Sequence, residues 1–325
     1  MTDSRILGAL SVGDAGARHF RSSDLGGMVA LLARLGKGAG APGEREFIDL
    51  FVRPEDGRDP TQDLVVVAAP DGRILGFAAL YRDDEFFSAM GPFLDPGLGE
   101  DMHRAAHALL NLLEREARNR DWDEVRFEVE GTSRQRLTLL HHRGYREVRV
   151  FRRLARMLES VPLQICLGPG AETLDSFASR MGEEPSRVLG SLMDKIFAHT
   201  WMYRAHGEPG AAQRLGRQGA GAGRVLLAID ELYDRPQGFL EWSAPGTGQE
   251  AFIDELGVLA SGRRQGLGGR LLSTGLAEIR RSGARVVGLD VDQSNRAARA
   301  LYERAGFEEV GRIRYLSCWV QGGRT

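Results

Sequence analysis

Short apolar runs alternate along the chain with stretches whose apolar residues recur every three or four positions, and these patterns predict strands and helices respectively. The predicted strands cover residues 64–69, 74–81, 125–129, 225–229, 237–242, 252–259 and 284–291, with a closing strand from Gly306 and Phe307. The predicted helices cover residues 25–35, 103–118, 134–142, 185–199, 267–280 and 295–305. Two strand pairs read as hairpins, and residues 199–210 and 213–223 read as loops. This mixture predicts an α/β fold with a mixed (α+β) sheet.

The strand that ends near Leu259 is followed by a turn rich in arginine and glycine and then directly by a helix. Backbone N–H groups at the start of a helix have no intrahelical partner, so such a turn favours an anion. Gly266 and Gly268 carry no side chain that would block a ligand, and Arg263 and Arg264 add positive charge. No Gly-Lys-Ser/Thr follows, and Leu271 stands where a dinucleotide fingerprint needs its third glycine. We therefore expect a phosphate or pyrophosphate ligand of another kind.

A second motif begins about 30 residues later, in the last predicted helix. Ser294 or Asn295 is suited to cap this helix, and Gly306 is suited to end it. Asn295, Ala298 and Tyr302 are spaced i, i+3 and i+7, so they share one helix face.

Together these motifs resemble the GNAT superfamily of N-acetyltransferases. Arg263-x-x-Gly266-x-Gly268 looks like motif A, and Asn295-x-x-Ala298-x-x-Leu301-Tyr302 resembles the family's next helix. The resemblance implies that acetyl-CoA is bound with its pyrophosphate on the turn, and with its thioester carbonyl at backbone N–H groups around Gly257 and Val258. It also implies that Tyr302 protonates the leaving thiolate. The implied cofactor-binding residues are Leu256, Gly257, Val258, Arg263, Arg264, Gln265, Gly266, Leu267, Gly268, Gly269, Asn295, Ala298 and Tyr302.

The general base is less evident. Many members of the family carry a carboxylate six residues before the position of Val258, where this chain has Phe252. The nearest acids are Asp254 and Glu255. In an unbroken strand Asp254 shares a face with Phe252 and Val258, whereas Glu255 lies opposite, so strand parity favours Asp254 unless a bulge intervenes. A water chain is the alternative base, and the outer candidates are Glu241, Glu250, His199 and His206.

The pattern of elements occurs twice. Asp123–Glu130 matches Arg285–Asp292, and Gly144 matches Gly306 at an offset of 162 residues. We therefore expect two tandem GNAT domains, residues 1–159 and 160–325. The first copy is degenerate, because Asp101, Arg104, Ala106, Ser133 and Leu140 stand at the positions of Arg263, Gly266, Gly268, Asn295 and Tyr302.

Composition narrows the function further. The 325 residues carry a net charge of −2, which gives no reason to expect nucleic-acid binding. No apolar run reaches 18 residues and no leader pattern is present, so we expect a cytoplasmic protein without a membrane partner. Cys166 and Cys318 are expected to be reduced, with no metal. We expect a monomer, with a homodimer as the alternative.

The tandem arrangement, with Gly238-Phe239-x-x-Trp242 before an intact motif A, looks most like the mycothiol synthase family. That family acetylates the cysteinyl amine of a sugar-linked thiol precursor. The resemblance implies direct acetyl transfer, in a ternary complex, to the primary amine of a small molecule. Other amines (an amino sugar, an amino acid or a peptide N-terminus) stay open, as does a non-catalytic CoA-binding regulatory or scaffold protein.

Overall fold

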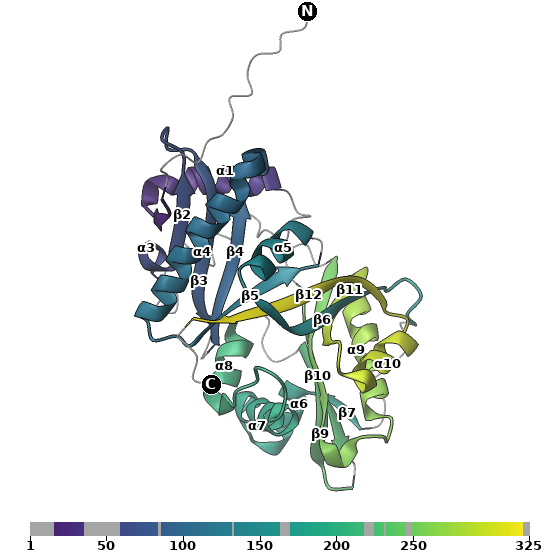
Figure 1. Cartoon of the computed structure of the whole chain (residues 1–325). Helices are drawn as coiled ribbons and strands as arrows, with labels where there is room; N and C mark the ends of the chain where they lie inside the picture. The colour runs from purple at the N-terminus through teal and green to yellow at the C-terminus, as the bar shows by residue number, and fades with distance from the viewer. Residues whose placement is uncertain are drawn as a thin grey trace, which may run out of the picture. The chain divides into compact units, whose positions relative to one another are not determined.

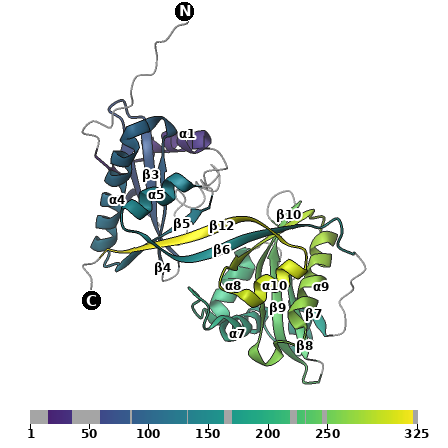
Figure 2. The same cartoon turned by 45° about the vertical axis from the view of Figure 1, so that its right-hand side comes forward.

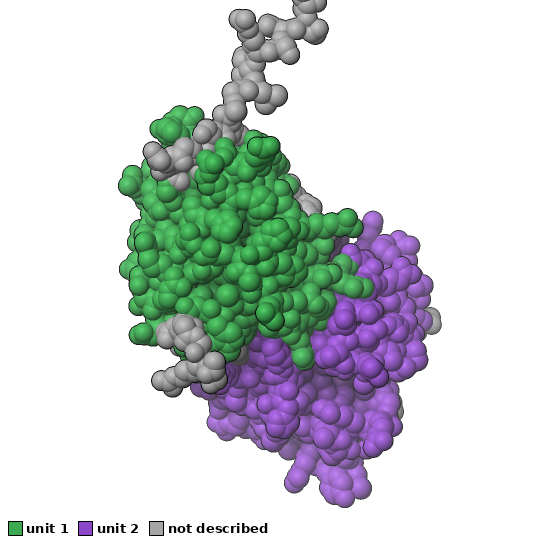
Figure 3. Space-filling model, viewed as in Figure 1, with its two compact units in different colours: residues 1–151, 311–325 green, residues 152–310 purple. Residues whose placement is uncertain are grey.

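The computed structural model describes residues 16–35, 59–83, 86–131, 133–162, 170–217, 224–230, 232–244 and 249–320 (Figure 1). The chain forms two compact units (Figure 3). Unit 1 contains residues 1–151 and 311–325, and unit 2 contains residues 152–310. The mixed α/β fold predicted from the sequence is confirmed, because each unit contains a sheet with both parallel and antiparallel pairs.

The strand order in unit 1 is β1-β2-β3-β4-β5-β12. The strands are β1 (Arg18–His19), β2 (Leu64–Ala68), β3 (Ile74–Asp83), β4 (Phe86–Leu94), β5 (Glu124–Glu130) and β12 (Glu308–Trp319). The helices are α1 (Leu25–Leu35), α3 (Pro60–Asp63), α4 (Met102–Asn119) and α5 (Arg134–His142). Successive residues of β2 point to opposite faces of the sheet and pack in two different hydrophobic cores. Val65 and Val67 pack in the core that includes α4, and Leu64 and Val66 pack in the core that includes α1.

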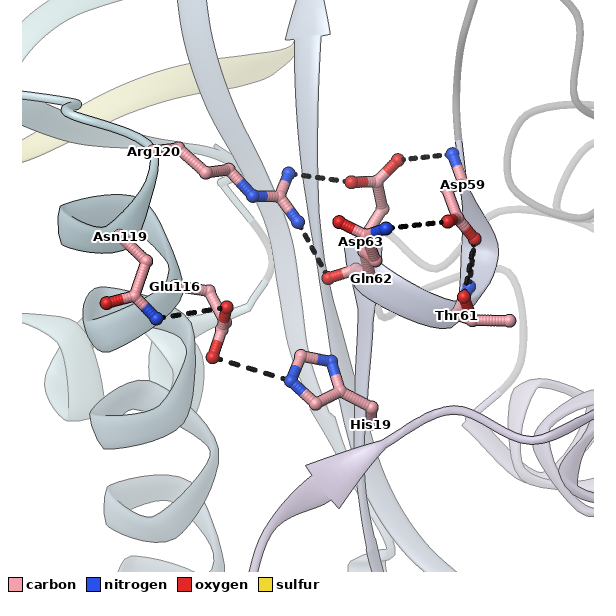
Figure 4. A network of polar contacts seen from close by, with 8 residues as sticks. All are labelled: His19, Asp59, Thr61, Gln62, Asp63, Glu116, Asn119 and Arg120. Atoms are coloured by element: carbon pink, nitrogen blue, oxygen red, sulfur yellow. Dashed lines mark hydrogen bonds and ion pairs between the residues drawn. The ribbon is translucent and has the colours of Figure 1, made fainter.

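A polar network ties the edge of the unit 1 sheet to the C-terminal end of α4 (Figure 4). The Arg120 guanidinium lies 2.7 Å from Asp63 Oδ1 and donates to the Gln62 carbonyl at 2.8 Å. Asp59 caps α3 by accepting from the Thr61 amide at 2.9 Å. On β1, His19 lies 3.4 Å from Glu116. These contacts hold the short helix α3 against α4, which is a structural role.

The strand order in unit 2 is β6-β11-β10-β9-β8-β7. The strands are β6 (Arg146–Met157), β7 (Ala171–Thr173), β8 (Val225–Asp230), β9 (Arg235–Ser243), β10 (Glu250–Val258) and β11 (Val286–Asp292). The helices are α6 (Leu174–Met181), α7 (Pro185–Phe197), α8 (Gly207–Arg217), α9 (Leu267–Arg281) and α10 (Arg296–Arg304). Residues of α9 and α10 share one core with the sheet, and residues of α6, α7 and α8 share another, so helices cover both faces (Figure 2).

The closing strands of the two sequence repeats are exchanged. β12 ends the second repeat, yet its residues 313–319 pair with β5 in unit 1. β6 ends the first repeat, yet its residues from Arg152 onward belong to unit 2. There the Arg153 guanidinium donates two hydrogen bonds to the Asp290 carboxylate on β11, at 3.0 and 3.1 Å. The units therefore do not coincide with the repeats, and the boundary after residue 159 stays a prediction about the duplication.

Two predicted loops were partly wrong. Residues 207–217 form α8, which includes the end of the predicted 199–210 loop and the start of the predicted 213–223 loop. Residues 218–223 lie outside the described residues. The glycines of this stretch suggested a loop, but Ala211 is 2% exposed and Leu215 packs on the core below, so burial outweighs their weak helix propensity.

Candidate active site

The turn between β10 and α9 is an open cradle of backbone N–H groups. Arg264 and Gly266 adopt left-handed backbone angles, with φ of +62° and +78°, and α9 begins at Leu267 without a side-chain cap. None of the N–H groups of residues 264–269 donates to any other described residue. A Cβ built on Gly266 would meet nothing within 4 Å. Unpaired donors, the helix dipole and an open surface suit a phosphate or pyrophosphate.

Hydrogen bonds from the turn's own side chains hold this cradle in shape. Arg263 Nε donates to the Val258 carbonyl at 3.2 Å, and Gln265 Nε2 donates to the Ser261 carbonyl at 2.9 Å. Ser261 Oγ in turn donates to Gln237 Oε1 at 3.0 Å. Arg263 therefore stabilises the turn in addition to bringing a positive charge to it.

The remaining glycines predicted to contact the cofactor differ in how tightly their surroundings are packed. A Cβ at Gly268 would lie 3.5 Å from Leu301 on α10 and one at Gly269 would lie 3.9 Å from it, which are ordinary van der Waals contacts. A Cβ at Gly257 would lie 2.5 Å from Ile196 on α7. The close approach of α7 to β10 therefore requires glycine at position 257.

β10 and β11 separate just before the cradle. Their parallel pairing runs from Glu250 opposite Val286 to Phe252 opposite Gly288, and beyond Phe252 β10 pairs only with β9 among the described strands. The β11-facing backbone groups of residues 254–258 are therefore outside a ladder. Leu256, Gly257 and Val258, predicted to contact the thioester, lie along this opening.

A β-bulge at Asp254 decides where the two candidate bases point. Ile253 pairs with Trp242 and Glu255 pairs with Glu241, so Asp254 is the extra residue on β10. The parity argument that favoured Asp254 required an unbroken strand, and the bulge removes its basis. Glu255 consequently lies directly opposite Glu241.

Only one oxygen of the Asp254 carboxyl is hydrogen-bonded. Its Oδ1 accepts from Ser243 Oγ at 3.0 Å, and its Oδ2 is buried without a hydrogen-bond partner among the described residues. Burial raises the pKa of Asp254 to about 6, the Ser243 hydrogen bond opposes that rise, and the negative charge of Glu241 adds to it.

Glu255 is half-buried and lies 3.6 Å from the Nη2 atom of Arg214 on α8. Burial raises the pKa of Glu255 to about 7; the charge of Arg214 opposes this rise, while Glu241 and Asp254 add to it. A carboxyl group that titrates near neutrality is suited to take a proton from an amine at physiological pH.

Tyr302 is 6% exposed on α10, and its ring centroid lies 5.7 Å from that of Phe307. Burial raises the pKa of the Tyr302 phenol above its ordinary value, and the charge of Glu255 raises it further. Its hydroxyl forms no hydrogen bond to a described residue, so it can serve a ligand. On the same helix the Asn295 side chain accepts from the Ala298 amide at 3.1 Å, so Asn295 acts as the helix cap.

The four outer candidates for the general base differ in their exposure to solvent. Glu250, His199 and His206 are exposed, and the His206 amide donates to Asp194 Oδ1 at 3.3 Å. Glu241 has no exposed surface and accepts from Arg214 Nε at 2.7 Å. Arg214 was missed because it lies in the stretch predicted to be a loop. An arginine three residues after buried Ala211 and next to Leu215 was the signal available.

Within the described residues, no three His, Cys, Asp or Glu side chains come together in a way that could hold a metal ion. No described helix is both long and apolar enough to cross a bilayer.

The chain is similar to known acetyltransferases. A family model described as "Acetyltransferase (GNAT) family" matches residues 193–307. The mycothiol acetyltransferase of Salinispora arenicola is 31% identical over 294 residues, which is 83% of this chain and 87% of that protein. The mycothiol acetyltransferase of Geodermatophilus obscurus is 28% identical over 87% of this chain and 92% of its own length.

Two solved structures are similar in fold. A GCN5-related N-acetyltransferase from Sphaerobacter thermophilus has a TM-score of 0.74 at 22% identity, over 94% of this chain and 96% of its own. A tandem GNAT protein from the clavulanic acid biosynthesis pathway has a TM-score of 0.65 at 16% identity, over 95% of this chain and 100% of its own. The cradle, Glu255 and Tyr302 all lie within the residues that the family model matches.

Proposed function

The chain belongs to the GNAT family of acetyltransferases and is an acyltransferase, and from this premise we propose that unit 2 transfers the acetyl group of acetyl-CoA to the primary amine of a small molecule. The observation that carries this proposal is the open cradle at residues 264–269 beside the separated strands β10 and β11. The cradle fits a pyrophosphate, because its donors are unpaired and no Cβ fills the space at Gly266.

We assign the base to Glu255 and the acid to Tyr302. Glu255 accepts a proton from the acceptor's ammonium group, which frees the nitrogen lone pair to attack the thioester carbonyl. As the carbon–sulfur bond breaks, the Tyr302 hydroxyl gives its proton to the departing thiolate, and the excess proton on the acylated nitrogen restores the Tyr302 hydroxyl. The influence of Glu255 on the pKa of Tyr302 supports this assignment, because it means that the two groups lie within electrostatic range of each other.

We propose direct transfer within a ternary complex. An acyl-enzyme route requires a nucleophilic side chain, and cysteine is the usual choice. Cys318 belongs to unit 1, and Cys166 lies outside the described residues. The described part of unit 2 therefore has no cysteine that could carry the acetyl group.

The acceptor class is proposed from the relatives named mycothiol acetyltransferase. We propose the cysteinyl amine of a sugar-linked thiol. The acidic residues Asp254, Glu241 and Glu255 suit an acceptor that arrives as a cation, although the charges of Arg214 and Arg224 oppose them in part.

The test is acetylation of cysteinyl glucosamine, followed by mass spectrometry of the N-acetyl product, because the acceptor's own thiol would obscure the release of free CoA. Seryl glucosamine and glucosamine are matched acceptors that lack the thiol and the cysteinyl amine respectively. We expect acetylation of cysteinyl glucosamine and none of glucosamine. Acetylation of glucosamine alone would reject the cysteinyl acceptor.

A CoA-binding protein without turnover is the second candidate. Phe252, in place of the family's carboxylate, favours it. Tight binding of acetyl-CoA, with no product from any acceptor in a panel of amino sugars, amino acids and peptides, would establish this candidate instead.

A further inference from the structure

The bulge at Asp254 creates an unusual pair across two strands. Glu255 and Glu241 face each other directly in the register of β10 and β9. Like charges at directly opposed positions repel, and Glu241 has no contact with solvent to weaken that repulsion. Some other group must therefore compensate these two carboxylates.

Arg214 provides the compensation. Its Nε donates to Glu241 Oε2 at 2.7 Å, and its Nη2 lies 3.6 Å from Glu255 Oε1. Burial tends to lower the pKa of Arg214, but the charges of Glu241 and Glu255 outweigh burial and hold that pKa above its usual value. One cation thus lies against two carboxylates.

The position of Arg214 is fixed by close packing of α8 against α7. A Cβ at Gly190 on α7 would meet the Gly207 carbonyl oxygen at 2.4 Å, so glycine at position 190 permits the close approach of the two helices. Ala211 is 2% exposed, and Leu215 packs on the same core. The backbone that carries Arg214 is therefore held on both sides of that residue.

We propose that Arg214 and Glu241 are positioning residues that together set the pH at which Glu255 can accept a proton. This inference rests on the proposed role of Glu255 as the base. Glu241 anchors the guanidinium by its short hydrogen bond, and Arg214 presents its remaining positive charge to Glu255. The catalytic residue is Glu255, and the other two act only through it.

Charged and titratable groups on several neighbouring elements influence the pKa of the Glu255 carboxyl. Arg214 on α8 stabilises its charged form, whereas Glu241 on β9 and Asp254 on β10 destabilise it. Tyr302 on α10 and Tyr203 after α7 also lie in its field, and burial keeps both phenols protonated at neutral pH. Removing the positive charge should therefore raise the pH at which Glu255 titrates, and removing the charge of Glu241 should lower it.

The experiment compares Glu241→Gln with Arg214→Gln. Glutamine at position 241 retains an oxygen that can accept from Arg214 Nε, so this variant removes the charge and keeps that hydrogen bond. The pH titration of the Glu255 carboxyl is followed by carbon NMR in protein labelled at the glutamate carboxyl carbons, with Glu255→Gln used to assign the signal. The titration should move by about one pH unit, downward in Glu241→Gln and upward in Arg214→Gln.

Arg214→Lys is the conservative control, because it keeps the positive charge and should leave the titration within about 0.3 pH units of the parent. If Arg214→Gln does not fold, the downward shift in Glu241→Gln still tests the proposal. The acidic limb of kcat/KM should move in the same directions as the NMR titration.

Unchanged titration in Glu241→Gln, or shifts of the same sign in both charge-removing variants, would overturn the positioning role. Failure of the proposed function looks different. The NMR shifts would then appear as expected, but Glu255→Gln would retain parental acetyl transfer.

Discussion

The Nε atom of Arg214 lies 2.7 Å from Oε2 of Glu241, whose side chain has no exposed surface. The two residues come from α8 and β9, 27 positions apart in the chain. A buried carboxylate that loses its cation keeps the cost of its desolvation, so the pair matters for stability even where its net contribution is small.

We therefore expect Arg214→Met to lower the free energy of unfolding by about 2–3 kcal/mol, a value discounted from that of fully buried pairs because Arg214 is partly exposed. The double variant Arg214→Met, Glu241→Met leaves no buried charge and should recover most of this loss. Denaturant unfolding measures both. An equal loss in the single and the double variant would mean that the arginine contributes only packing.

The cradle is tested by Gly266→Asp compared with Gly266→Asn. Both residues tolerate the left-handed angle at position 266 better than other side chains and are nearly identical in size. Only aspartate brings a negative charge to the proposed pyrophosphate position. We expect acetyl-CoA to bind at least about tenfold more weakly to the Asp variant than to the Asn variant in calorimetry. Equal affinities of the two variants would show that the pyrophosphate lies elsewhere.

The two repeats should differ in cofactor binding. In unit 1, Asp101 lies where α4 begins, and buried Leu140 stands at the position that corresponds to Tyr302. The guanidinium of Arg136 lies 5.1 Å from the centroid of the Phe93 ring on β4. We expect one acetyl-CoA per chain, with the loss of affinity in Gly266→Asp applying to that single site. Two equivalent sites would contradict the degeneracy of the first repeat.

Tyr302→Phe removes the hydroxyl and keeps the ring contact with Phe307. If Tyr302 protonates the leaving thiolate, kcat should fall by roughly 100-fold while acetyl-CoA affinity changes little. Steady-state kinetics and calorimetry on the same preparation separate the two effects. Turnover within about threefold of the parent would assign the proton to water instead.

Much of the site follows from the sequence because its signals are local. The arginine- and glycine-rich turn predicted the cradle, and the helical spacing of Asn295, Ala298 and Tyr302 predicted their helix. The tandem GNAT fold expected from these motifs is confirmed by the family match and the tandem structural relative. Such features depend on neighbours within a few residues of each other.

The parts that sequence reasoning missed depend on distant partners. A bulge was the stated exception to the parity argument, but its presence at Asp254 is defined by the register of β10 against β9, which the residue types near position 254 do not determine. Arg214 lies beside Glu241 and Glu255 because α8 packs closely on α7, with Gly207 against Gly190. The exchange of β6 and β12 between the units is likewise a matter of pairing across the chain, since each closing strand could pair within its own repeat on pattern alone.

The most direct measurement of the central claim compares acetyl transfer by Glu255→Gln and Asp254→Asn, with the acceptor found active in the parent. Both changes remove a charge without altering shape, but only Glu255 is assigned as the base. We predict that Glu255→Gln lowers kcat by at least about 100-fold, whereas Asp254→Asn stays within about tenfold of the parent. The parent's kcat/KM should fall below about pH 7, where Glu255 becomes protonated, and the residual activity of Glu255→Gln should lack this limb. Loss of activity in Asp254→Asn with near-parental turnover in Glu255→Gln would contradict the account and move the base to Asp254.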